Sequence, residues 1–171
     1  MLVSPNNPDF ARRAARVRLL GIDFDGVMTD NMVFLFEDGR EAVRCSRLEG
    51  YGLRRAAMSG VHCFILSTEE NQVVTRRANK LKIECIQNCS DKVEAFGLML
   101  KKHGLSMEEA AFIGNDVNDL ELLKLVGLPA IVADAHEDLD ALKAFRTRRK
   151  GGDGAVRELC DAIATVRERS L

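Results

Sequence analysis

The sequence predicts an α/β fold, a Rossmann-like doubly wound sheet of mostly parallel strands that carries a β-hairpin insertion. Short continuous apolar runs alternate with segments of helical periodicity, which is typical of parallel strands covered on both faces. Several of these runs end in polar or charged residues, as expected where parallel strands present a ligand-binding edge. The pair Asp38-Gly39 lies between two β-prone runs and indicates the hairpin.

Five strands are expected in the parallel sheet, with helices between them. The strands are Val17–Asp23, Val61–Ser67, Lys82–Ile86, Ala110–Gly114 and Leu128–Ala133. The helices are Tyr51–Ser59, Asn71–Leu81, Asp91–Lys102, Val117–Val126, Glu137–Phe145 and about Ala155–Glu168. Ser106 and Glu109 have the spacing of a capping box, and Gly104 and Gly127 lie where helices should end.

The hairpin, about residues 32–45, follows the first strand directly. Its two arms are Met32–Phe36 and Glu41–Cys45. Phe34 and Phe36 lie on it and need cover from water. Packing on the parent domain and packing on a partner subunit are equally consistent with the sequence.

The composition bounds the domain count and the partners. A chain of 171 residues with 46% hydrophobic and 30% charged residues is expected to form one domain with its own core. The formal net charge of −1 predicts no nucleic-acid partner and no membrane-surface partner. Trp is absent and there is one Tyr, which disfavours a base-stacking surface.

Five scattered cysteines, an odd number, predict reduced thiols and a cytoplasmic protein. No apolar stretch approaches the ~20 residues of a membrane span. Residues 1–16 contain two prolines and several arginines without an apolar core segment, so we expect a flexible N-terminal extension and no signal peptide. Residues 17–171 are then the single folded domain.

The first strand ends in two carboxylates, Asp23 and Asp25. Residues two apart on a strand point the same way, so both side chains should lie together at the ligand-binding edge. Crowded carboxylates are costly unless protons or a cation relieve their repulsion. The pair therefore indicates a site with acid–base or metal chemistry.

Further polar residues follow the other expected strands and should converge on this pair. They are Ser67, Lys92, Asn115, Asp116 and Asp119. Together they suit phosphoryl transfer. A carboxylate can attack phosphorus, a second can move the proton, and a hydroxyl and a lysine can hold the phosphoryl oxygens. Oxygen ligands without His or Cys favour Mg²⁺.

This set of residues resembles the motifs of the haloacid dehalogenase superfamily, and the resemblance covers nearly the whole chain after about residue 16. It implies that Asp23 is the nucleophile, that Asp25 is the general acid/base, and that Ser67 and Lys92 complete the catalytic set. It also implies a Mg²⁺ site, with ligands drawn from Asp23, Asp25, Asn115, Asp116 and Asp119.

The short chain leaves no room for a cap domain. The hairpin, the triplet at 90–92 and the glycine-rich turn Gly151–Gly154 are similar to the capless phosphatases that act on 3-deoxy-octulosonate 8-phosphate or nononate 9-phosphate. They are also similar to the C-terminal domain of animal acylneuraminate cytidylyltransferases. The resemblance implies a homotetramer whose hairpins pack together and whose active sites are completed by a neighbouring subunit. Taken alone, the glycine-rich turn is as consistent with a flexible turn as with a phosphate loop.

Glu69, Arg77 and Lys80 are the candidate substrate-binding residues. Similarity to the nononate branch favours them, because octulosonate phosphatases carry Thr-Gly-Arg-Arg where this chain has Ser-Thr-Glu-Glu. Placed on one helix, the three would share a stripe beside an apolar stripe that packs on the sheet. The alternative is a solvated charged face.

Asn115 departs from the superfamily pattern, which usually has aspartate there. An amide oxygen can bind Mg²⁺ but brings no charge. The sequence thus predicts a Mg²⁺-dependent phosphatase of a 2-keto-3-deoxy sugar acid phosphate, nononate 9-phosphate before octulosonate 8-phosphate, acting through an aspartyl-phosphate. The alternative is a weakly active or non-catalytic oligomerisation or regulatory module working with an acylneuraminate cytidylyltransferase.

Overall fold

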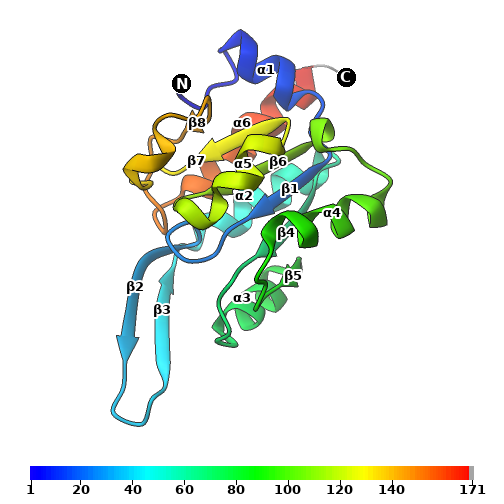
Figure 1. Cartoon of the computed structure of the whole chain (residues 1–171). Coiled ribbons are helices and arrows are strands. Elements are labelled where there is room, and N and C mark those ends of the chain that lie inside the picture. Colours follow the sequence, from blue (N-terminus) through cyan, green and yellow to red (C-terminus); the bar gives the residue numbers. More distant parts are fainter. Residues whose placement is uncertain (170–171) are drawn as a thin grey trace.

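The computed structural model describes residues 1–169 and has the predicted α/β architecture, with helices on both faces of a six-stranded sheet (Figure 1). The strand order is β5-β4-β1-β6-β7-β8, and every neighbouring pair is parallel. The strands are β1 (Leu19–Ile22), β4 (His62–Leu66), β5 (Glu84–Ile86), β6 (Ala110–Gly114), β7 (Leu128–Ile131) and β8 (Phe145–Arg146). The last two residues of the predicted domain, 170 and 171, lie outside the described part of the chain.

Most of the predicted helices are confirmed. The α-helices are α1 (Pro8–Ala14), α2 (Leu48–Met58), α3 (Val73–Leu81), α4 (Lys92–His103), α5 (Leu120–Leu125) and α6 (Ala155–Arg169). Single 3₁₀ turns form η1 (Met107–Glu109), η2 (Val117–Asp119) and η3 (Glu137–Leu139). Gly104 ends α4 in the left-handed region, and the capping box of Ser106 and Glu109 is present. No helix among the described residues is both long and apolar enough to cross a membrane.

The alternation of side chains along each strand divides the core into two layers. On β1, Leu20 and Ile22 face the layer that includes residues of α1, α2, α3 and α6, whereas Leu19 faces α4 and α5. Gly21 is needed on this strand because a Cβ there would lie 2.6 Å from the ring of Phe96. Both faces of β1 are therefore buried, and Asp23 follows directly after its C-terminal end.

The expectation of a flexible extension over residues 1–16 is wrong. These residues contain α1, whose first turn is capped by the Asn7 side chain, and Leu2 forms a β-bridge with Arg146 of β8. Phe10 is fully buried and meets Phe145 edge-on, with ring centroids 5.2 Å apart. Phe10 and Ala14, four residues apart, form the buried stripe of this helix. The stripe is difficult to detect in the sequence because it is short and arginines surround it.

The predicted helix over Glu137–Phe145 is also wrong. The segment forms only the short turn η3 and then the two-residue strand β8, which extends the sheet beyond β7. Leu139, in the turn, and Phe145, in the edge strand, are both buried. The apolar residues of this segment therefore pack from a turn and a strand and do not form one face of a helix. The other boundaries differ by a few residues, and the helix predicted from Asn71 begins at Val73.

The predicted hairpin is confirmed and lies apart from the main sheet. Its arms are β2 (Thr29–Leu35) and β3 (Glu41–Cys45), and they extend away from the body of the molecule (Figure 1). Gly39 supplies the positive φ of the turn. Five consecutive apolar residues from Met32 to Phe36 are exposed, with Phe34 at 64% and Leu35 at 72%. Packing on the parent domain is thereby excluded for these side chains, and cover by a partner stays a prediction.

Candidate active site

The predicted catalytic residues converge at the carboxyl edge of the sheet. A cleft of about 270 Å³ opens there after β1, β4 and β6. Its lining residues are Asp23, Asp25, Asn31, Ser67, Thr68, Asn115, Asp116, Val117 and Asn118. Because parallel strands share this edge, residues far apart in the sequence meet in one small volume.

Lys92 links Asp23, which lines the cleft, to the fully buried Asp119. Its Nζ donates to Asp23 Oδ1 at 2.8 Å and to Asp119 Oδ1 at 2.6 Å. The three residues are 5%, 4% and 0% exposed, so each charge depends on the others for compensation. Lys92 is the first residue of α4, whose start is fixed by the Asp91 side chain accepting two backbone N–H bonds.

Asp119 is fully engaged by its neighbours. Its Oδ2 accepts the backbone N–H of Asn115 at 2.9 Å and that of Asp116 at 3.4 Å, while Oδ1 holds Lys92. A Cβ on Gly114 would lie 2.3 Å from this carboxylate, so the glycine makes room for it. The geometry favours a positioning role for Asp119 over the predicted direct binding of a metal.

Asp23 and Asp25 both have raised pKa values. Burial raises the pKa of Asp23 to about 7, Asp119 adds repulsion, and Lys92 opposes both. Burial, followed by the nearby Glu69, also raises the pKa of Asp25, with a hydrogen bond from Thr29 acting against them. A bound cation would favour the ionised form of Asp23, whereas a raised pKa at Asp25 suits a group that donates a proton.

Asn115 completes a set of converging oxygens. One terminal atom of its amide lies 3.0 Å from the Asp25 carbonyl oxygen and 3.1 Å from Asp23 Oδ2. With the amide nitrogen there, Asn115 donates two hydrogen bonds; with the oxygen there, three oxygens surround one point. That oxygen set fits Mg²⁺. The amide lies against Gly26, where a Cβ would be 2.1 Å from Asn115 Nδ2.

Asp116 lies at the rim of the same cleft. It is half-buried, and its Oδ1 accepts the backbone N–H of Val117 at 2.7 Å. Asp116 is thus the remaining charged candidate near the Asn115 amide.

Ser67 and Glu69 lie in the loop after β4. Ser67 is 1% exposed, and its Oγ accepts the backbone N–H of Glu69 at 3.1 Å. Glu69 lines an adjoining pocket of about 310 Å³ together with Asp25 and Met32 at the base of the hairpin. The expectation that Glu69 shares a helical stripe with later residues is wrong, because α3 begins only at Val73.

Arg77 and Lys80 lie on α3, away from the catalytic cleft. They line a separate cavity between α3 and α2, of about 450 Å³, that contains none of the catalytic residues. Arg77 Nη2 donates to the Ser46 carbonyl oxygen at 2.6 Å, which holds the end of the hairpin. The structure does not bring these two residues to the cleft of their own chain, and their role in substrate binding stays a prediction.

Glu49 is a buried carboxylate that the sequence analysis gave no role. It is 0% exposed and accepts the backbone N–H of Gly154 at 3.1 Å and of Arg157 at 2.7 Å, at the start of α6. Burial raises its pKa to about 7. The glycine-rich turn that precedes α6 is packed rather than flexible, since Gly152 N–H donates to the Val27 carbonyl after β1. The available signal was a lone glutamate in the run from Leu48 to Leu53, whose other residues are apolar or glycine.

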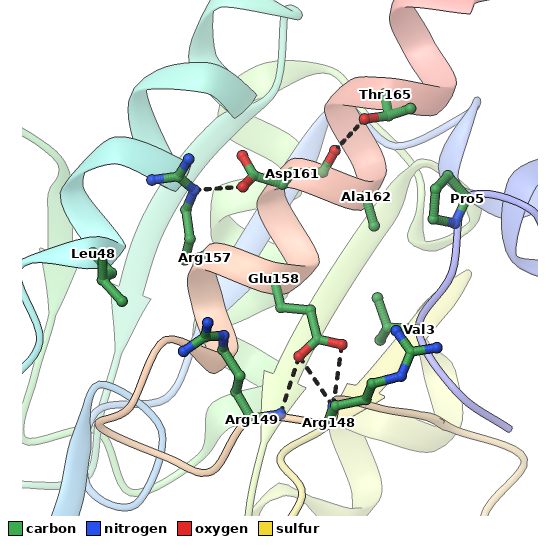
Figure 2. A pocket seen from close by; sticks show the side chains of 10 residues that line it. All are labelled: Val3, Pro5, Leu48, Arg148, Arg149, Arg157, Glu158, Asp161, Ala162 and Thr165. Carbon is green, nitrogen blue, oxygen red and sulfur yellow. Dashed lines mark hydrogen bonds and ion pairs between the residues drawn. The ribbon is translucent and has the colours of Figure 1, made fainter.

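A larger cavity of about 480 Å³ lies on the outer side of α6, away from the catalytic residues (Figure 2). Three arginines contribute to its lining, but acidic side chains and carbonyl groups accompany them. Glu158 accepts the backbone N–H groups of Arg148 and Arg149, and Arg157 pairs with Asp161 at 2.5 Å. The smaller cleft, not this cavity, holds the groups suited to phosphoryl transfer.

Comparison with known proteins agrees with this geometry. Residues 64–159 match the family model described as haloacid dehalogenase-like hydrolase. A 3-deoxy-D-manno-octulosonate 8-phosphate phosphatase of Yersinia pestis is 37% identical over 166 residues, 96% of this chain and 89% of that protein. The chain belongs to the haloacid dehalogenase-like hydrolase family. Among its members, the Escherichia coli K12 protein of the same name is 35% identical over 93% of this chain and 85% of its own length.

Solved structures share the fold of this chain. A hypothetical protein of Xanthomonas campestris superposes with a TM-score of 0.93 at 32% identity, covering 99% of this chain and 94% of that one. A 3-deoxy-D-manno-octulosonate 8-phosphate phosphatase of Moraxella catarrhalis, in complex with magnesium ion, phosphate ion and KDO, has a TM-score of 0.89 at 30% identity. It covers 93% of this chain and 92% of its own.

Proposed function

We propose that this chain is a phosphatase that releases phosphate from a 2-keto-3-deoxy sugar acid phosphate. The observation that carries the proposal is the chain of contacts from Asp23 through Lys92 to Asp119, with Asp25 beside it in one cleft. This arrangement provides a carboxylate nucleophile, a fixed cation and a second carboxylate for proton transfer. The octulosonate phosphatases among the relatives support the substrate class.

In the first step, a carboxylate oxygen of Asp23 attacks phosphorus, and the bond from phosphorus to the sugar oxygen breaks. Asp25 donates a proton to that leaving oxygen, in keeping with its raised pKa. The products of this step are the free sugar acid and an aspartyl-phosphate on Asp23. Lys92 and Ser67 hold the phosphoryl oxygens while charge builds on them.

In the second step, Asp25 accepts a proton from a water molecule, and the water oxygen attacks phosphorus. The bond between phosphorus and Asp23 breaks, which frees inorganic phosphate and restores the carboxylate. Asp119 takes no part in bond making. Its two oxygens keep Lys92 and the backbone of residues 115 and 116 in place through both steps.

Mg²⁺ is the proposed cofactor, held by Asp23 Oδ2, the Asp25 carbonyl oxygen and the Asn115 amide oxygen, with Asp116 nearby. When bound, the ion offsets the repulsion between the carboxylates and the substrate phosphate. The neutral amide of Asn115 contributes no charge, so we expect weaker binding than an aspartate would give. The convergence of the amide with two oxygens, at 3.0 and 3.1 Å, supports this ligand set.

The choice between the nine-carbon and the eight-carbon sugar acid rests on different observations. Glu69 stands beside Asp25, in a pocket that adjoins the cleft and extends toward the hairpin, and it supports the predicted preference for nononate 9-phosphate. The names of the relatives support octulosonate 8-phosphate. Both substrates therefore belong in the test.

A second candidate function is a weakly active or non-catalytic module that works with an acylneuraminate cytidylyltransferase. The Asn115 amide is the observation that favours it. With nitrogen toward Asp23 and Asp25, the side chain satisfies both oxygens by hydrogen bonds and leaves no need for a cation. This candidate predicts binding between the two proteins without phosphate release.

The deciding experiment measures Mg²⁺-dependent phosphate release from nononate 9-phosphate and octulosonate 8-phosphate. We expect release from at least one of them, and a loss of at least about 10³-fold in Asp23→Asn, because the amide is not a nucleophile. Circular dichroism checks that the variant is folded. Absence of release above the Asp23→Asn level, on both substrates and on a wider panel of phosphate esters, would support the module instead.

A further inference from the structure

Three potential metal ligands gather at the amino edge of the sheet, opposite the catalytic cleft. His62 begins β4, Glu84 begins β5, and His103 is the last residue of α4. Phe64, which lies two residues after His62, pairs with Glu84 across the two strands and faces the α4 layer. Alternation along β4 places His62 on that same face, where it meets the end of the helix.

The three side chains lie within reach of one ion. One ligand atom from each lies within 4.8 Å of the others. His62 Nε2 is 3.1 Å from Glu84 Oε1, and the rings of His62 and His103 have centroids 4.3 Å apart. A tetrahedral zinc site with bonds of about 2.0–2.2 Å separates its ligand atoms by roughly 3.4 Å. The 3.1 Å between His62 Nε2 and Glu84 Oε1 is close to this separation, and the other pairs of ligand atoms lie within 4.8 Å.

One ring nitrogen of each histidine, Nε2, lacks a hydrogen bond. Nε2 of His62 and Nε2 of His103 are both shielded from solvent, and neither has a hydrogen-bond partner. The Glu84 oxygen beside His62 is close enough but not aligned for such a bond. Leaving a buried polar atom without a partner is unfavourable, because the atom has lost its hydrogen bonds to water. A metal ion placed between the two nitrogens would remove this cost at both.

Glu84 presents one carboxylate oxygen to the histidines, with Oε1 lying 3.1 Å from His62 Nε2. Lys102 pairs with the other oxygen of this carboxylate, Glu84 Oε2. Oε1 is left to face the histidines, so the contact with Lys102 does not occupy the proposed ligand atom.

We propose that His62, Glu84 and His103 bind a divalent transition-metal ion, for which Zn²⁺ is the test ion. Two imidazole nitrogens and one carboxylate oxygen are the ligands, and water completes the tetrahedron. The ion ties the end of α4 to the first residues of β4 and β5 and thereby stabilises the fold. The catalytic cleft offers only oxygen ligands, so the two sites prefer different metals.

The test uses tag-free protein in which Asp23→Asn and Asn115→Ala remove the cleft as a competitor. Equilibrium dialysis against Zn²⁺, in excess Mg²⁺, is expected to give one Zn²⁺ per chain. His103→Gln and His62→Gln are each expected to weaken binding at least tenfold. Lys102→Ala is the matched control, since it removes a neighbouring charge but no ligand, and it should bind Zn²⁺ at least as tightly.

Two further measurements make the result independent of catalysis. Co²⁺ in a nitrogen-containing tetrahedral site absorbs strongly in the visible, and this absorption should vanish in both histidine variants. Zn²⁺ should raise the melting temperature of the parent protein but not of the variants, whose metal-free melting curves show that they fold. Failure of the parent protein to bind Zn²⁺, or equal binding by parent and His103→Gln, would overturn the proposal.

Discussion

The catalytic cleft and the neighbouring hairpin both depart from the usual pattern of burial, in which apolar side chains are inside and charged ones outside. In the cleft, Asp23, Lys92 and Asp119 are charged and at most 5% exposed. In the hairpin, Phe34 and Leu35 are apolar and 64% and 72% exposed. The two regions adjoin each other at the base of the hairpin. Each is a place where the chain needs something from outside itself: a substrate or an ion in one case, and cover for apolar surface in the other.

Replacing Lys92, the positive side chain between Asp23 and Asp119, should have the largest effect on the free energy of unfolding. Lys92→Met leaves Asp23 and Asp119 buried without a positive partner, and we expect a loss of about 3–5 kcal/mol in the free energy of unfolding. Urea titration measures it. Lys124→Met is the matched control, because Lys124 pairs with Glu121 at the same 2.6 Å on the surface and should cost at most about 1 kcal/mol. Equal losses in the two variants would contradict the contrast.

Glu49 tests whether a buried charge outside the cleft behaves differently. Burial raises its pKa from 4.5 to about 7, so the folded protein keeps a proton that the unfolded chain releases in this range. The corresponding stability is fully present below about pH 4.5 and is lost as the pH rises to about 7, by at most about 3 kcal/mol.

Glu49→Gln should remove this loss, which urea titrations across the pH range would measure as a flatter stability profile. Glu158→Gln is the control, because Glu158 also accepts backbone N–H bonds but is only half-buried. A profile that keeps its slope in Glu49→Gln would show that the pH dependence arises elsewhere.

Asn115→Asp sharpens the account of the metal site. The carboxylate adds charge toward Mg²⁺, and we expect binding to become about tenfold tighter, or ~1.4 kcal/mol. Without Mg²⁺ the variant should melt at a lower temperature than the parent, because it loses the amide donor and crowds three oxygens together. Titration of the melting temperature with Mg²⁺ measures both effects. Unchanged Mg²⁺ affinity would count against Asn115 as a ligand.

The hairpin should show the smallest effect on the stability of the chain itself. Phe34→Ser together with Leu35→Ser removes exposed apolar groups and should change the unfolding free energy of the monomer by at most about 0.5 kcal/mol per site. Self-association should be lost, as measured by sedimentation velocity. Leu98→Ser is the control, since Leu98 is 63% exposed on α4 and away from the hairpin. A monomeric parent protein would refute the prediction of hairpin-mediated assembly.

Much of the catalytic edge was predictable, because strand periodicity and the topology of parallel sheets place Asp23, Ser67 and Asn115 at neighbouring strand ends. Lys92 also follows this logic, since Asp91 is a strong helix N-cap. Periodicity was misleading where an element was short or irregular. Glu69 lies before α3 rather than on it, and this shift of a few residues separates it from Arg77 and Lys80.

Contacts between distant segments could not be predicted in this way. The helix around Phe10 is held by Phe145, and Glu49 caps a helix more than a hundred residues later. The group formed by His62, Glu84 and His103 likewise depends on a strand register and on where α4 ends. Each requires knowledge of which elements become neighbours, and composition and spacing do not carry that information.

The base of the hairpin forms part of the pocket wall beside Asp25, through Asn31, Met32 and Val33. The same strand continues into the exposed apolar residues that require cover. Whatever covers the hairpin therefore also fixes the wall of the substrate pocket. We expect the specific activity of each chain to depend on protein concentration, falling on dilution as the covered hairpins separate, so that assays at high and low enzyme concentration describe two different catalysts.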